Sequence, residues 1–314
     1  MGSLLSTKCS SNNRLDGKVA VITGANTGIG KETAKDFYRR GATVILACRN
    51  LEKANEAMDD IKKNFTHSTN LGEIRIVELD LSSLESVRAC AKQLLDTEEE
   101  INILINNAGI MMSPYNKTKD GFELHFATNY LGHFLLTILL LPKICRCAPA
   151  RIINVSSVLH WIFGGIDYSD VHFDKRKYLA LHAYQQSKLA NILFTKELAK
   201  RLSENNITGV NVYCLHPGII RTELSRHLNS IFPGLTWIYD SFGAIFFKNS
   251  LQGAQTQIYC AVSDECAHET GLYYSECRPT CCSSSARDSE SAEKLWHISL
   301  KSVGFDPNTN VFQI

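Results

Sequence analysis

The chain has 314 residues, 44% hydrophobic and 21% charged, which is typical of a folded protein with a sizeable core. Its 33 basic and 32 acidic residues give a formal charge of +1 without a long basic run, so nothing indicates a nucleic-acid partner. Eleven cysteines without C-x-x-C pairs or a preceding secretory signal predict reduced thiols in a cytoplasmic protein, and the ten histidines show no metal-site spacing, so no metal is expected.

Residues 1–16 are expected to form a flexible tail. In "MGSLLSTKCS", Gly2 and Ser6 match the pattern for N-myristoylation, and Cys9 lies close enough to accept a second acyl chain. One acyl chain binds a membrane only marginally, so stable anchoring would need both. The alternative is a tail that matches the pattern by accident. No run of 18 apolar residues occurs, and no membrane-spanning helix is expected.

Short apolar runs then alternate with longer segments of helical spacing. Continuous apolar runs, typical of strands buried on both faces, lie at 19–23, 42–47, 74–79, 101–106, 151–156 and 209–215. Helical spacing predicts helices within 28–40, 51–64, 83–97, 121–146 and 183–204. The alternation predicts an α/β fold, a doubly wound (Rossmann), mostly parallel sheet with helices on both faces. Without a linker or repeat, residues 17–305 are expected to form a single domain, followed by a tail over 306–314.

The turn after the first predicted strand, "TGANTGIGKE", contains Gly24, Gly28 and Gly30 and leads into a helical pattern. Glycine lets the backbone approach a pyrophosphate, which the N–H groups and dipole of the helix N-terminus would stabilise. A glycine cluster alone is weak evidence. Its position at the first strand-to-helix turn predicts a dinucleotide site.

The ends of the second and third strands bear on which dinucleotide binds. A carboxylate at the end of the second strand would bind the ribose 2'-hydroxyl of NAD, but "LACRN" supplies Arg49 instead. A guanidinium suits a 2'-phosphate, so NADP(H) is favoured, although Arg49 could also be a solvated surface residue. Asp80, after the third strand, could accept from the adenine amino group or cap the next helix, where Ser82 competes. The small residues of "INNAG", up to Gly109, would let the cofactor lie across the fourth strand.

Two later segments concern catalysis. In "HAYQQSKLAN", Tyr184 and Lys188 lie one helical turn apart, where a fixed ammonium would lower the phenol pKa towards the range of acid-base catalysis. Ser156 and Ser157 end the fifth strand, where a hydroxyl could hold a substrate carbonyl oxygen. Asn129 is unusual in an apolar helix unless its amide is used, and the alternative is a buried amide satisfied by backbone.

The segment 225–250 breaks the strand-helix alternation. It holds six aromatic side chains around Pro233 and Gly234 and follows the last predicted strand, on the side where such sheets bind ligands. It could form a substrate lid, a membrane-touching surface or ordinary core helices. The stretch 275–290, rich in Ser and Cys, is expected to be loop.

Together the glycine turn, "INNAG", the serines, Tyr-x-x-x-Lys and "HPGIIRT" resemble the short-chain dehydrogenase/reductase family from about Gly17 to Thr222. The resemblance implies a catalytic tetrad of Asn129, Ser157, Tyr184 and Lys188, with Ser157 preferred to Ser156 because the family's serine follows the strand's last inward residue. It also implies cofactor contacts from Gly24, Asn26, Gly28, Ile29, Gly30, Arg49, Asp80, Leu81, Asn107, Ala108, Gly109, Pro217, Gly218 and Thr222, besides Tyr184 and Lys188.

The segments "GANTGIGKETA", "NNAGIMM", "NYLGHF" and "SKLANILFTKELAKRL" resemble the retinol dehydrogenase branch of that family. The resemblance implies an NADP(H)-dependent oxidoreductase of a small lipophilic substrate, most simply retinal and retinol. Tyr184 would pass the proton, Ser157 would position the oxygen and Asn129 would hold a relay water. Lipid-derived or isoprenoid aldehydes and steroids are alternative substrates, and a catalytically silent NADP-binding scaffold is an alternative role.

Many members of that branch carry a hydrophobic N-terminal anchor, which this sequence lacks. Acylation at Gly2 and Cys9, or the segment 225–250, could replace it at the cytosolic face of a membrane, and a soluble enzyme is the alternative. The sequence leaves the oligomeric state open.

Overall fold

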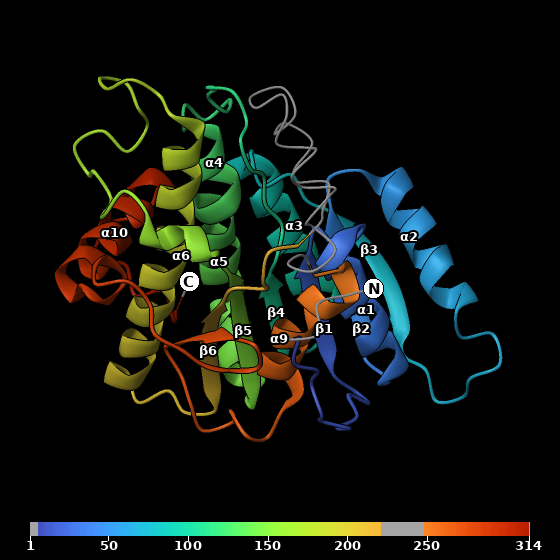
Figure 1. The fold of residues 1–314 in the computed structure, drawn as a ribbon. Coiled ribbons are helices and arrows are strands. Elements are labelled where there is room, and N and C mark those ends of the chain that lie inside the picture. Colours follow the sequence, from blue (N-terminus) through green and yellow to red (C-terminus); the bar gives the residue numbers. More distant parts are fainter. Residues whose placement is uncertain (1–5, 221–247, 314) are drawn as a thin grey trace.

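The computed structural model describes residues 6–220 and 248–313. Its centre is an eight-stranded sheet in the order β3-β2-β1-β4-β5-β6-β7-β8, parallel up to β7 and closed by antiparallel β8 (Figure 1). The strands are β1 (Val19–Thr23), β2 (Thr43–Cys48), β3 (Glu73–Glu78), β4 (Ile103–Asn106), β5 (Ala150–Val155), β6 (Val210–Leu215), β7 (Leu272–Ser275) and β8 (Arg278–Pro279). The predicted doubly wound fold is confirmed.

Helices follow most of the strands. They are α1 (Gly28–Arg39), α2 (Leu51–Lys63), α3 (Leu84–Thr97), α4 (Leu124–Phe126), the π-helical turn η1 (Ala127–Leu131), α5 (Gly132–Arg146), the 3-10 turn η2 (Val158–Trp161), α6 (Ala180–Glu204), α9 (Ser250–Val262), the 3-10 turn η4 (Ser285–Arg287) and α10 (Ser289–Ser302). Ser83 caps α3 through its side chain, which accepts from the Ser86 N–H. The predicted cap at Asp80 or Ser82 is therefore wrong.

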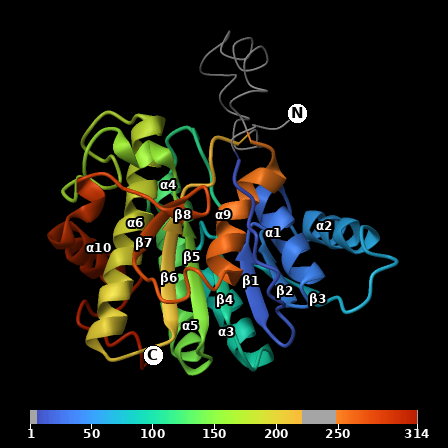
Figure 2. The ribbon, with the colours of Figure 1, turned by 60° about the horizontal axis from the view of Figure 1, so that its bottom comes forward.

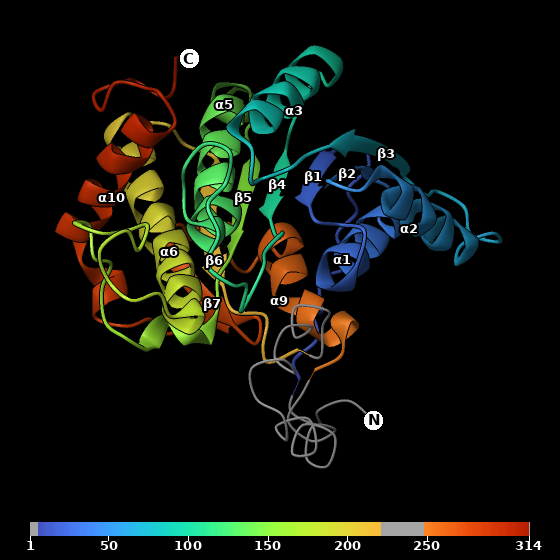
Figure 3. The same ribbon diagram turned by 90° about the horizontal axis from the view of Figure 1, so that it is seen from above.

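The helices form two layers, one on each face of the sheet, as the view from above shows (Figure 3). Side chains of β1 alternate between two cores: Val21 belongs to the cluster with α3, α5, α6 and α10, while Ala20 and Ile22 belong to the cluster with α1 and α9. Because successive strand residues point to opposite faces, both sets must be apolar. This explains why the strands read as continuous apolar runs.

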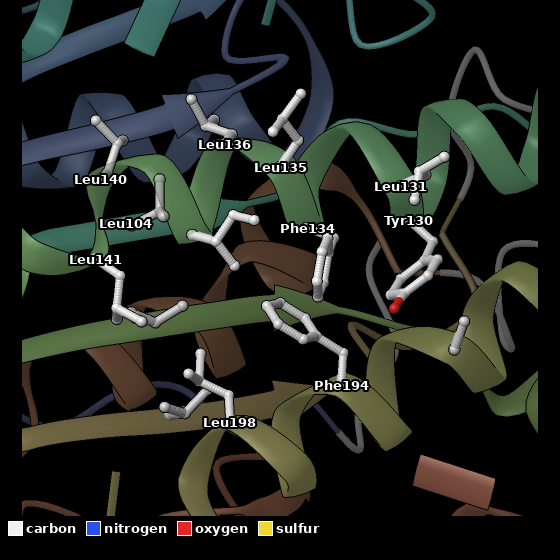
Figure 4. Packing of buried hydrophobic residues seen from close by; sticks show 14 of the residues in the cluster. Leu104, Tyr130, Leu131, Phe134, Leu135, Leu136, Leu140, Leu141, Phe194 and Leu198 are labelled. Carbon is white, nitrogen blue, oxygen red and sulfur yellow. The ribbon is translucent and has the colours of Figure 1, made fainter. Parts of the chain in front are cut away.

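The larger core lies where α5 packs against β4 and α6. Figure 4 shows Phe134 of α5 beside Phe194 of α6, and their ring centroids are 5.3 Å apart. Trp296 of α10, which runs beside α6 (Figure 2), completes this aromatic group at 5.3 Å from Phe134. Burying aromatic rings in edge contacts contributes about 0.5–1.5 kcal/mol per pair beyond the burial of their area.

Among the described residues, one continuous helix, Leu124–Arg146, is long and apolar enough to cross a membrane by length and composition alone. It comprises α4, η1 and α5, and 83% of its apolar window is buried inside the protein. It is thus the central core helix of this fold, which is apolar because protein covers it on nearly every side.

The C-terminal third departs most from the sequence expectation. Strand β7 extends the sheet beside β6, β8 lies within the stretch predicted as loop, and the helices α9 and α10 were not assigned from periodicity. Helix α9 has almost no polar face, and buries two glutamines among its apolar residues. A helix with so little amphipathic contrast leaves no periodic signal.

Both predicted tails are partly packed. The backbone N–H of Cys9 donates to Gln255 Oε1 at 3.1 Å, and Asn13 Nδ2 donates to the Val262 carbonyl at 3.0 Å, so residues 9–13 lie along α9. Near the other end, Val311 is buried in the larger core. Residues 9–16 and 311 therefore belong to the folded domain, because their apolar side chains and backbone groups find partners there.

Candidate active site

The candidate catalytic residues lie where β5 ends and α6 begins, at the carboxyl edge of the sheet. Lys188 Nζ donates to the carbonyl of Val155, the last residue of β5, at 2.9 Å. Ser156 Oγ donates to the Lys188 carbonyl at 2.6 Å. These two bonds fix the N-terminal half of α6 against the end of the strand.

Tyr184 and Lys188 are both buried, 6% and 3% exposed, and Lys188 Nζ lies 5.7 Å from the centre of the tyrosine ring. Burial raises the pKa of Tyr184 to about 12, and a hydrogen bond with Ser157 opposes that rise. Burial lowers the pKa of Lys188 to about 8. Burial is the largest cause acting on the Tyr184 pKa in this structure, and the lowering of that pKa by Lys188 stays a prediction. Tyr184 is a protonated phenol at neutral pH.

The two serines after β5 have different surroundings. Ser156 is engaged with the α6 backbone, whereas the Ser157 hydroxyl reaches the Tyr184 phenol and accepts from the Leu159 N–H at 3.2 Å. Ser157 also caps η2, so the turn that follows the strand aims its hydroxyl at the tyrosine. Of the two candidates, the structure brings Ser157 to the phenol.

Asn129 lies inside the π-helical turn η1. Its side chain accepts from the Ile110 N–H at 2.8 Å and donates to the Ile110 carbonyl at 3.0 Å and to Ser187 Oγ at 2.9 Å. The Asn129 amide thus has protein partners for its hydrogen bonds. This matches the alternative of a buried amide satisfied by backbone, which stands beside the predicted relay role. A π turn displaces the helix by one residue and is frequent at functional sites. Here it directs Asn129 at the segment that leaves β4.

The glycine turn leads into α1 as the sequence predicts. Thr27, the N-cap of α1, makes no side-chain capping bond, so the first-turn N–H groups are left for another acceptor. Gly28 has φ +58, and a Cβ placed there would meet nothing within 4 Å among the described residues. Asn26 and Ile29 lie in this turn, and Gly30 is buried behind it.

Residues from the end of β4 support the same turn. Asn107 Nδ2 donates to the Thr23 carbonyl at 2.8 Å, and the Thr23 hydroxyl accepts from the N–H groups of Asn107 and Ala108 at 2.9 Å. Asn107 Oδ1 is buried without a hydrogen-bond partner in the described part of the chain. The free helix terminus, the open space at Gly28 and this spare acceptor fit a bound dinucleotide.

The adenosine-side residues are spread over the ends of β2 and β3. Arg49 is exposed directly after β2, and no ion pair or hydrogen bond of its guanidinium is found within the described residues. Asp80 Oδ1 accepts from the Ser82 N–H at 2.9 Å and its hydroxyl at 2.6 Å, which forms a local turn. Leu81 is buried in the larger core. Among residues 6–220 and 248–313, the Arg49 guanidinium thus has no partner, whereas the Asp80 carboxylate is bonded to Ser82.

After β6 the chain turns at Pro217 and Gly218. Gly218 has φ +93, and a Cβ there would lie 2.6 Å from Lys248 Cδ, so only glycine fits. Lys248 is buried and ion-paired with Glu276. His216 Nδ1 accepts from the Val158 N–H at 3.2 Å, which ties this turn to the serine turn. Burial first, then Lys248, lowers the pKa of His216 to about 4, so His216 is neutral.

The sequence does not predict three residues of this turn, namely His216, Lys248 and Glu276. The one available signal is that His216 directly precedes Pro217. Gly109 does lie as predicted, since a Cβ there would be 3.4 Å from Lys188 Nζ. Thr222 and nearly all of the predicted lid, 225–250, lie outside the described residues. Across residues 6–220 and 248–313, no group of three or more metal-binding side chains is found.

Comparisons with known proteins agree with this geometry. A family model described as short chain dehydrogenase matches residues 18–169. The chain is 47% identical to retinol dehydrogenase 12 of Mus musculus over 296 residues, 94% of this chain and 89% of that protein. It is 45% identical to retinol dehydrogenase 13 of Homo sapiens over 302 residues, 95% of this chain and 88% of that protein.

Two solved structures share the fold. An uncharacterised protein from Mycobacterium paratuberculosis is 33% identical with a TM-score of 0.75, covering 97% of this chain and 100% of that one. The complex of Pseudomonas aeruginosa RhlG with NADP at its active site is 26% identical with a TM-score of 0.64, covering 83% of this chain and 94% of that one.

Proposed function

The chain belongs to the short-chain dehydrogenase/reductase family, and from that premise we propose that it interconverts retinal and retinol with NADP(H). The observation that carries the proposal is the similarity to retinol dehydrogenases over nearly the whole chain. The cluster of Ser157, Tyr184 and Lys188 at the sheet edge supports it, because it offers the proton that carbonyl reduction needs.

When bound, NADPH supplies the hydride that reduces the carbonyl carbon. Tyr184, protonated at neutral pH, donates its phenolic proton to the substrate oxygen as that oxygen gains negative charge. Ser157 donates to the same oxygen and orients it. Lys188, whose pKa of about 8 leaves it mostly protonated at neutral pH, places its ammonium 5.7 Å from the centre of the Tyr184 ring and stabilises the phenolate that Tyr184 becomes.

Arg49 supports NADP(H) over NAD(H). Its exposed guanidinium follows β2, where a carboxylate would select the 2'-hydroxyl of NAD. We expect Arg49→Asp to raise the KM for NADPH by at least about tenfold, the size of one lost charge-assisted pair, and to leave kcat with saturating cofactor nearly unchanged. A wild-type enzyme that uses NADH as well as NADPH would contradict the preference.

The substrate is tested by steady-state kinetics with all-trans-retinal beside nonanal and farnesal, following the oxidation of NADPH. The proposal predicts the highest kcat/KM for retinal. Faster turnover of nonanal or farnesal would reassign the enzyme to lipid-derived or isoprenoid aldehydes. A chain that binds NADPH and turns over none of the three would refute the enzymatic function.

Membrane association rests, in this proposal, on N-myristoylation at Gly2, with the enzyme at the cytosolic face of a membrane. Cys9 does not fit a second acyl site, because its side chain is buried and burial raises its thiol pKa, which lowers the fraction of reactive thiolate. The intact mass of the N-terminal peptide from native cells tests this. An unmodified Gly2 would rule the anchor out.

A further inference from the structure

A second polar cluster lies beside Tyr184 and takes no part in the reaction described above. It consists of Ser113, Glu123, His125 and Tyr178. Glu123 and His125 are completely buried, and the His125 ring packs edge to face on the Tyr184 ring with centroids 6.3 Å apart. A buried carboxylate is costly unless it is fully hydrogen-bonded, so this cluster needs an explanation.

Hydrogen bonds link the members of this cluster to one another and to the backbone. Glu123 caps the central helix and accepts from the N–H groups of His125 at 2.9 Å and Phe126 at 2.7 Å. The Ser113 N–H donates to His125 Nε2 at 3.2 Å, so the imidazole proton must be on Nδ1, which donates to Glu123 Oε1 at 2.9 Å. His125 is therefore a neutral imidazole that links the carboxylate to the backbone of Ser113.

Tyr178 completes the attachment from the other side. Its hydroxyl donates to the Ser113 carbonyl at 3.0 Å, with Glu123 Oε1 at 3.3 Å. Burial, followed by the charge of Glu123, raises the pKa of Tyr178, so the hydroxyl stays a donor. Both backbone groups of Ser113 are thus held by side chains from distant parts of the chain.

Ile110, three residues before Ser113, has its backbone held in the same way. Asn129 binds both the N–H and the carbonyl of Ile110. Between these two anchors lie Met111 and Met112, and Met112 has φ +59, a strained value for a residue with a side chain. Strain of this kind persists only where the surroundings over-determine the backbone, and it gathers at functional sites.

The segment runs past the candidate catalytic residues. It begins at Gly109, next to Lys188 and Asn129, and ends at Ser113, against His125, whose ring packs on the ring of Tyr184. Met112 is buried and Met111 partly exposed. Methionine is flexible and polarisable, and suits contact with an extended apolar molecule.

We propose that His125 and Tyr178 are positioning residues that hold residues 110–113 as a wall for the apolar body of the substrate. The inference rests on the proposed function, since it assigns the substrate-binding surface of the same site. Neither residue touches the reacting atoms: both hold the backbone of Ser113, and the His125 ring also packs against the Tyr184 ring. The wall should therefore affect the binding of long substrates and leave the chemical step unaltered.

The test compares Tyr178→Phe with a matched control, Tyr168→Phe. Tyr168 also donates its hydroxyl to a serine carbonyl, that of Ser291 at 2.7 Å, but it does so beside α10. We expect Tyr178→Phe to raise the KM for retinal about 3- to 10-fold, the effect of one lost hydrogen bond, with kcat and the Kd for NADPH within about twofold. The KM for propanal, too short to reach the wall, should not change, and Tyr168→Phe should change none of these.

A second pair of variants guards against a folding defect in the first. His125→Leu removes the imidazole hydrogen bonds with Ser113, Glu123 and Tyr178, whereas His125→Gln keeps an acceptor for the Ser113 N–H. We expect His125→Leu to raise the KM for retinal. The rise in log KM for His125→Gln should be at most half of the rise for His125→Leu. An unchanged KM for retinal in a folded Tyr178→Phe, or an equal rise for propanal, would overturn the wall. Wild-type protein that reduces propanal but not retinal would instead overturn the proposed substrate.

Discussion

Replacing Lys188 with methionine measures what burying the catalytic cation costs the fold. Burial lowers the pKa of Lys188 from 10.5 to about 8. At about 1.4 kcal/mol per pH unit, this drop corresponds to about 3 kcal/mol in the free energy of unfolding. Methionine has a similar length and no charge, so it relieves that cost. The variant loses the hydrogen bond from Lys188 Nζ to the Val155 carbonyl. That carbonyl still accepts a hydrogen bond from Asn191 Nδ2 at 3.3 Å, so it is not left unpaired. We expect a net gain of about 1–3 kcal/mol near pH 7.

The gain should depend on pH with a defined sign. Below about pH 8, both the folded and the unfolded wild-type chain hold the Lys188 proton, and the cost is present in full. Between about pH 8 and 10.5, the folded protein has released the proton while the unfolded chain still binds it, so wild-type stability rises with pH. The methionine variant lacks this rise. The difference between the two proteins should therefore shrink as the pH increases through this interval.

Urea denaturation of both proteins without added cofactor, at about pH 7 and about pH 10, measures the difference, since the other lysines and tyrosines titrate alike in both. NADPH oxidation with retinal, run in parallel, should show kcat reduced by about 10² or more. A methionine variant that is less stable than wild type at both pH values would refute the reasoning, because burial of the ammonium would then not be a cost.

Four further substitutions probe the site. Tyr184→Phe should lower kcat by about 10²–10⁴ with the Kd for NADPH within about twofold, and retained turnover would sink the assignment of the proton donor. Gly30→Ala would put a Cβ 2.7 Å from the Gly24 carbonyl oxygen. The Kd for NADPH, measured by fluorescence titration, should therefore rise at least about tenfold. Unaltered binding would argue against the turn as the cofactor site. Ser157→Ala should reduce kcat, whereas Ser156→Ala should mainly reduce the unfolding free energy, by about 1–3 kcal/mol, and the reverse pattern would exchange the two roles.

The six apolar runs located the first six strands to within two residues at each end, because each had to cover both faces of the sheet. Strand β7 could not be read in the same way. Its four residues, "LYYS", follow a turn, and only the free edge of β6, a property of the assembled sheet, makes them a strand. Helix α9 lacks a polar face, so its periodicity is hidden.

In the site, the sequence predicts those residues that have a characteristic spacing or position in the chain. Tyr184 and Lys188 share a helix, and Ser157 follows a strand end. Their electrostatics could not be read from spacing, because the pKa of Tyr184 depends on how far tertiary packing removes it from water. The π turn at Asn129 was equally hidden, since an inserted residue inside a helical pattern leaves the apolar residues close to their expected places.

The contact between Phe134 and Trp296 links the middle of the chain to its last helix. On the ribosome, α5 emerges well before α10 has been made, and until then one side of its aromatic surface has no cover. A nascent chain at that stage exposes an apolar helix surface, the kind of surface that holding chaperones bind. A premature stop codon before Ser289 should therefore produce aggregated protein rather than a shortened enzyme, although every residue of the proposed tetrad would have been translated.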